Sequence, residues 1–104
     1  MALRIVEIFL PAAFPDGTPV PKAQFDLVRQ EIVELFGGVT SYDLTPARGL
    51  WKDAGQVEAD PIVVMEVMTT GSVDKRWWKA FRNRMEDAFR QKEILIRVHT
   101  ASRL

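Results

Sequence analysis

The chain has 104 residues, and its 14 basic and 14 acidic side chains cancel, so no net charge favours a dedicated nucleic-acid-binding protein. It contains no cysteine, which excludes disulfides and thiolate metal sites. No apolar run approaches the ~20 residues that a membrane-spanning helix needs, and the N-terminal residues do not resemble a signal peptide. We therefore expect a single cytoplasmic domain that is stabilised by its own hydrophobic core.

The first half of the chain predicts a strand, a loop, a helix and a second strand. Residues 3–10 are mostly strand formers. The next segment, 11–21, contains four prolines and forms a loop. Apolar residues at helical spacing then indicate a helix that begins near the last of these prolines and ends at Gly37-Gly38. Residues 39–44 alternate between apolar and polar side chains, which indicates the second strand.

The second half repeats this order after a long connection. Residues 45–60 predict an extended hairpin, and residues 62–69 form the next strand, with strand formers on both faces. Ser72 or Asp74 can cap the helix that follows, since both side chains accept hydrogen bonds from free backbone N–H groups. The last strand spans 94–98, and a polar tail follows it.

The order β-α-β-β-α-β predicts a ferredoxin-like α+β sandwich. It consists of a four-stranded antiparallel sheet with two helices on one face and the long hairpin between the second and third strands. Residues 3–10 and 62–69 are apolar on both faces, so we place them at the centre of the sheet. Right-handed connections lead us to expect that these two strands are parallel neighbours.

Each of the two central strands contains one glutamate, Glu7 and Glu66, at the same place in its apolar pattern. Side chains alternate across a sheet, so both glutamates fall on the face without helices, together with Arg97 and His99. We call this face the open face, and we expect Glu7 to lie between the basic residues and Glu66. The remaining open-face residues are too apolar to meet water, which predicts a homodimer packed sheet against sheet.

Two interpretations of these four side chains stay open. In the first they form a small-molecule pocket in which Glu7 and Glu66 act as acid and base, His99 moves a proton and Arg97 anchors an anion. In the second they are internal ion pairs, Glu7 with Arg97 and Glu66 with His99 or a partner chain. A histidine and two carboxylates could also hold a metal ion, but no ligand spacing supports this, so we predict neither metal nor cofactor.

The hairpin predicted at 45–60 has two possible roles. Trp51 and, at its base, Tyr42 could close the open-face pocket, and we include both among the candidate ligand-binding residues. The alternative is a dimerisation arm that reaches the partner subunit. We favour the arm.

A basic stretch opens the second predicted helix. Residues 74–84 include five basic side chains and one acidic side chain, interleaved with aromatic residues. Such a pattern can bind a nucleic-acid backbone and stack on bases. Trp78 and Phe81 also fit the apolar stripe of the helix, however, and this favours a core face with a solvated basic face opposite. Nucleic-acid binding is therefore the weaker interpretation.

Three segments in the middle of the chain, 36–40, 49–53 with Gly55, and 60–67, resemble small uncharacterised bacterial proteins with a ferredoxin-like core. The architecture is also similar to that of dimeric α/β-barrel proteins, which include monooxygenases and small-molecule binders. This resemblance implies a dimer, and an enzyme of that type would use the two open-face glutamates for acid–base chemistry. The remaining alternatives are an interaction module and a trimeric regulator of the nitrogen-signalling type, although no phosphate-binding loop is present.

Overall fold

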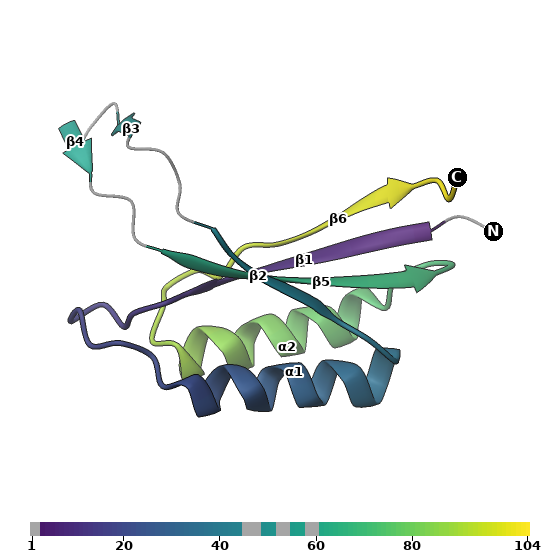
Figure 1. Ribbon diagram of the computed structural model, residues 1–104, viewed down its shortest axis with the longest axis horizontal. Helices are drawn as coiled ribbons and strands as arrows, with labels where there is room; N and C mark the ends of the chain where they lie inside the picture. The colour runs from purple at the N-terminus through teal and green to yellow at the C-terminus, as the bar shows by residue number, and fades with distance from the viewer. Residues whose placement is uncertain (1–2, 45–48, 52–54, 58–60) are drawn as a thin grey trace.

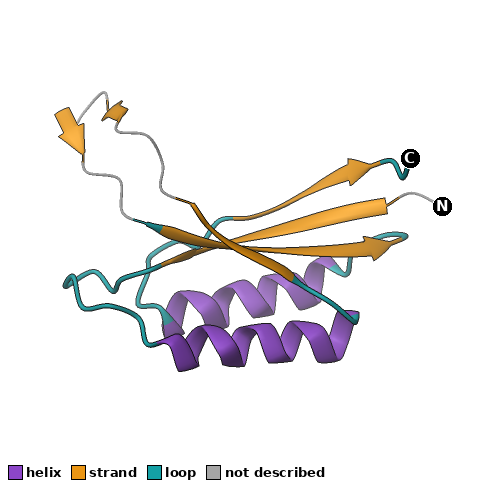
Figure 2. Cartoon of the chain, viewed as in Figure 1, coloured by secondary structure: helices purple, strands orange, loops and turns teal. Residues whose placement is uncertain are grey.

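Both helices pack against one face of a four-stranded sheet, and within the described part of the chain the opposite face has no helix (Figures 1 and 2). The computed structural model describes residues 3–44, 49–51, 55–57 and 61–104. The arrangement confirms the predicted ferredoxin-like fold. In chain order the elements are β1 (Leu3–Pro11), α1 (Lys22–Phe36), β2 (Thr40–Leu44), β3 (Gly49–Trp51), β4 (Gly55–Val57), β5 (Ile62–Thr70), α2 (Lys75–Ala88) and β6 (Ile96–Ala101).

The strand order in the main sheet is β2-β5-β1-β6, so the two most apolar strands are central, as predicted. The expected parallel pairing of these strands is wrong, because β1 and β5 run antiparallel. The crossover through α1 gives β2 the same direction as β1. Since β5 then pairs antiparallel with β2, it must also run opposite to β1.

The helix ends follow the local sequence signals. Gly37 adopts a left-handed conformation with φ of 86°, which glycine reaches without steric strain, and its N–H bonds to the Val33 carbonyl. At the start of α2 the Asp74 carboxylate accepts a hydrogen bond from the Trp77 backbone N–H at 3.1 Å. Of the two predicted caps, Asp74 is therefore the one the structure uses.

The last strand lies further along the chain than predicted. We expected 94–98, whereas β6 is Ile96–Ala101 and pairs with residues 3–8 of β1. Ile94 is buried in the core, and its N–H donates to the Glu86 carboxylate at 3.1 Å instead of to a strand. Thr100, which we assigned to a polar tail, pairs with Arg4. The pattern of apolar residues misplaced the strand because Ile94 is a core residue of the connecting segment.

The core fills the space between the sheet and the two helices. It takes the side chains that alternate toward the helices, such as Ile8 and Met65, and the inner stripe of each helix, such as Ile32 and Phe81. These four side chains are fully buried. Burying each contributes roughly 1.5–3 kcal/mol, so this layer dominates the stability of the fold.

Strands β3 and β4 form a separate antiparallel ladder inside the predicted 45–60 hairpin, with Leu50 opposite Gln56. In Figure 1 this ladder lies beyond one end of the main sheet, on the side away from the helices. Its side chains fall outside the described residues, so its role as a lid or a dimerisation arm stays a prediction.

Among the described residues, no helix is both long and apolar enough to cross a membrane.

Candidate functional site

One row of side chains crosses the open face from strand to strand. Glu7 of β1 lies opposite Glu66 of β5 on one side and opposite Arg97 of β6 on the other. Thr40 of β2 extends the row beyond Glu66. Glu7 therefore has the neighbours that strand parity predicted. We give the name open-face cluster to Glu7, Glu66, Arg97, His99 and Tyr42.

Glu7 is a buried acid with a charged partner. Only 7% of the residue is exposed, and Arg97 donates a hydrogen bond from Nε to its Oε1 at 2.8 Å. The Arg97 guanidinium also lies 5.0 Å from the centre of the Phe9 ring, which is a cation–π contact. The hydrogen bond and the charge of Glu7 both raise the pKa of Arg97 above its ordinary value, so this side chain stays cationic.

Glu66 has a different kind of partner. The Tyr42 hydroxyl donates a hydrogen bond to Glu66 Oε1 at 3.1 Å. Burial, the hydrogen bond and the charge of Glu66 all raise the pKa of the Tyr42 phenol, with burial the largest cause. The phenol therefore remains a protonated donor over the physiological range.

His99 is placed beside Glu7 rather than beside Glu66. Its Nε2 lies 3.5 Å from Glu7 Oε1, and His99 pairs with Ile5, one row away from Glu7. The proposed Glu66–His99 pair within one chain is therefore wrong, because the strand β1 separates the two side chains. Within the described ranges no group of three His, Asp or Glu side chains is arranged to hold a metal ion.

Large apolar side chains surround the open-face cluster. Val64 and Leu3 are buried within the single chain although they alternate toward the open face. Met68 and Leu95, by contrast, are 53% and 56% exposed. The open face of one chain thus combines a buried acid with apolar surface in contact with water.

The two candidate ligand-binding residues other than Arg97 have different outcomes. Tyr42 joins the open-face cluster through Glu66, as described above. Trp51 belongs to β3, and its side chain lies outside the described residues.

In the basic stretch of α2 the aromatic residues face the core and the basic residues face solvent, as predicted. Trp78 and Phe81 are buried against the sheet, and Lys75 and Lys79 are exposed. Arg84 donates two hydrogen bonds to the Glu31 carboxylate, at 3.1 and 2.8 Å, and so links the two helices. The positive charges therefore line an exposed helix face.

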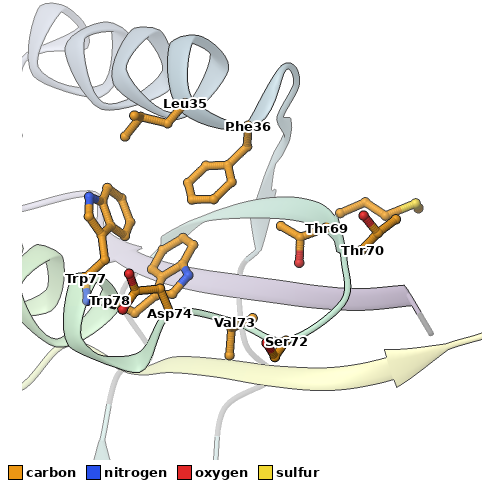
Figure 3. Close-up of a pocket in the computed structure, with 10 residues that line it drawn as sticks. Leu35, Phe36, Thr69, Thr70, Ser72, Val73, Asp74, Trp77 and Trp78 are labelled. Atoms are coloured by element: carbon orange, nitrogen blue, oxygen red, sulfur yellow. Dashed lines mark hydrogen bonds between the residues drawn. The ribbon is translucent and has the colours of Figure 1, made fainter. Parts of the chain in front are cut away.

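A pocket of about 540 Å³ lies at the edge of the sheet rather than over the open-face cluster (Figure 3). It is formed by the last residues of α1, the last residues of β5, the connection that follows, and the first turn of α2. We call it the edge pocket. Its principal lining residues are Phe36, Met68, Thr69, Asp74, Trp77 and Trp78.

Sequence reasoning missed the edge pocket because its residues come from the ends of elements, where periodicity carries little information. One signal was available. Thr69 follows Val63, Met65 and Val67 on the helix-facing side of β5, and it is polar where an apolar residue is expected.

No model of a known protein family matches this chain, and no curated protein matches its sequence. Among solved structures it is similar to a phage SAM lyase in complex with S-methyl-5'-thioadenosine. The two chains share 11% sequence identity with a TM-score of 0.62, and the match covers 97% of this chain and 90% of the lyase chain. At this level of identity the likeness establishes a common fold.

Proposed function

We propose that the protein is a homo-oligomer that binds a small cationic molecule at the open-face cluster. The observation that carries this proposal is the position of Glu7, which is buried in an apolar face directly opposite a second glutamate. Like charges opposite each other destabilise a sheet, and Arg97 neutralises only one of the two carboxylates, so a cationic ligand would offset the charge that remains.

The charges of the open-face cluster favour a cation. Glu7 and Glu66 supply two carboxylates, and Arg97 supplies one guanidinium, which leaves an excess of one negative charge when the histidine is neutral. An aromatic ring, that of Tyr42, lies beside Glu66, and the ring of Phe9 already contacts a cation, the Arg97 guanidinium. Carboxylates next to aromatic rings are a suitable environment for a positively charged ligand.

A second copy of the chain would complete the site. Met68 and Leu95 need a cover, and the simplest cover is the open face of a partner, which would enclose both clusters between two sheets. The 45–60 hairpin would add contacts at the end of the sheet. The cytoplasmic location expected from the sequence stays a prediction.

S-adenosylmethionine (SAM) is the first ligand to test. The structurally similar phage protein is a SAM lyase, and SAM carries a sulfonium cation, the charge that this site would select. S-adenosylhomocysteine keeps the adenosine and amino-acid groups of SAM but has a neutral thioether in place of the sulfonium. The pair therefore separates recognition of the cation from recognition of the nucleoside.

The test is a calorimetric titration of both compounds into the wild-type protein and into a Glu66→Gln variant. We expect SAM to bind more tightly than the thioether and to lose about tenfold or more in affinity in Glu66→Gln, since a charge-assisted contact is removed. Glu34→Gln on the exposed side of α1 is the matched control and should bind like wild type. Equal affinity of Glu66→Gln and wild type for SAM, or a monomer by sedimentation, would refute the proposal.

The Tyr42–Glu66 hydrogen bond also favours a second candidate, an enzyme that uses acid–base chemistry at this cluster. In this case Glu66 accepts a proton from the bound molecule while the Tyr42 hydroxyl orients the Glu66 carboxylate, and His99 beside Glu7 gives a proton to the same molecule. Incubation with SAM followed by chromatography tests the candidate. A Tyr42→Phe variant should bind SAM but form product more slowly, whereas absence of product with wild type leaves binding as the only role.

A further inference from the structure

The edge pocket exists because β5 continues beyond its neighbour. β2 begins at Thr40, opposite Glu66, so the residues of β5 after Glu66 have β1 on one side and no β2 residue on the other. The end of α1 and the first turn of α2 flank this step in the sheet, as Figure 3 shows. The pocket is therefore a result of strand length and is separate from the open-face cluster, with which it shares no residue.

One polar atom in the pocket wall has no partner. The Thr69 hydroxyl oxygen is buried and makes no hydrogen bond to any described residue. A buried hydroxyl without a partner destabilises a protein, because it has lost its hydrogen bonds to water. Valine has nearly the same shape and would avoid this penalty. The fold alone therefore does not explain a threonine at this position.

Aromatic rings form the wall that faces Thr69. Phe36 stacks on Trp78 with ring centres 5.4 Å apart and meets the edge of Trp77 at the same distance. In Figure 3 the indole nitrogen of Trp78 is on the side of its ring toward Thr69 and Val73. Flat apolar surfaces and a hydroxyl without a partner among the described residues thus lie in one pocket.

We propose that the edge pocket binds a planar nitrogen heterocycle about the size of a purine. Its volume of about 540 Å³ is within the ~300–1,000 Å³ typical of small-molecule sites. The planes of the Phe36 and Trp77 rings are 80° apart, so one ring would contact a face of the heterocycle and the other its edge. The Thr69 hydroxyl is shielded in the free protein, and on binding it would rotate toward the edge of the heterocycle and bond to it, as would the Trp78 N–H.

Adenine is the probe for this site, and toluene is the matched ring without polar atoms. Both are titrated into a Trp51→Phe background, so that the fluorescence comes from Trp77 and Trp78. In Thr69→Val we expect adenine affinity to fall roughly three- to tenfold, the loss that one neutral hydrogen bond gives, and toluene affinity to stay unchanged. The control Thr100→Val makes the same change on the exposed strand β6 and should leave both affinities unaltered.

The melting temperature is a second measurement that distinguishes a ligand-binding threonine from a structural one. Thr69→Val should raise the melting temperature of the ligand-free protein while it weakens adenine binding, and a purely structural threonine would not give both effects. The proposal is overturned if adenine does not bind up to its solubility limit, or if Thr69→Val binds it as well as wild type does. It is also overturned if Glu66→Gln abolishes adenine binding, because the probe would then occupy the open-face cluster.

Discussion

Replacing Glu7 with leucine should make the protein more stable. Leucine has a similar volume and matches the apolar residues around it, such as Ile5 and Val64 on the same face. Exchange of a buried ion pair for apolar side chains is often neutral or stabilises by ~1–4 kcal/mol, whereas removal of one partner destabilises when the other charge stays buried. Arg97 is 59% exposed and can be hydrated after the exchange, so we expect about 1 kcal/mol, at the low end of this range.

The assay is urea denaturation of wild type, Glu7→Leu and Glu7→Gln, repeated at several protein concentrations because association adds to apparent stability. A gain of 1 kcal/mol corresponds to a rise of about 4–8 °C in Tm for a chain of this size. The same Glu7→Leu protein should lose SAM binding. If Glu7→Leu is instead clearly less stable than wild type at every concentration, Glu7 is an internal structural ion pair, and the argument from its burial fails.

Three further outcomes are expected. The folded-state pKa of Tyr42 is raised, so its contribution to stability is complete below pH 10 and is lost as the pH rises through the raised value. Because Tyr42 is the single tyrosine of the chain, its ultraviolet absorbance should titrate with a midpoint above 10.0, and a midpoint at or below that value would contradict the Glu66 contact. Asp74→Ala removes the α2 cap and should lower the free energy of unfolding by about 1 kcal/mol in urea, while an unchanged midpoint would show that the cap is dispensable. Arginine at Met68 or Leu95 should convert the oligomer to monomers in sedimentation, and persistence of the oligomer would place its interface elsewhere.

Much of the fold could be predicted because it depends on patterns that a short window of sequence contains. Alternation in the two central strands put Glu7 and Glu66 on one face, and the structure has them opposite each other. The direction of pairing was missed because it depends on how connections route the chain, which is a property of the whole topology. The start of β6 was missed because Ile94 continues the apolar pattern while its backbone bonds elsewhere.

The site was only partly predictable, because the sequence gives the face on which a side chain lies but not the register of the strands. Arg97 and Glu7 meet because they occupy the same row, and parity is enough to show this. Tyr42 as the partner of Glu66 required the register of the short strand β2, which alternation alone does not fix. Predicting the edge pocket would have required knowing where β5 extends beyond the end of its pairing with β2. The relative lengths of paired strands are known only once the sheet is assembled.

The pairing of β6 with β1 has a consequence for the order of folding. Glu7 and Arg97 are 90 positions apart in the chain, so during synthesis from the N-terminus the acid emerges long before its partner exists. Until β6 arrives, β1 is an edge strand that displays an unpaired carboxylate, and such a charge discourages pairing with other chains. Long-range closure of this kind is slow, and we infer that it comes last. Glu7 would then keep the incomplete sheet soluble until β6 pairs with β1 and Arg97 bonds to the carboxylate.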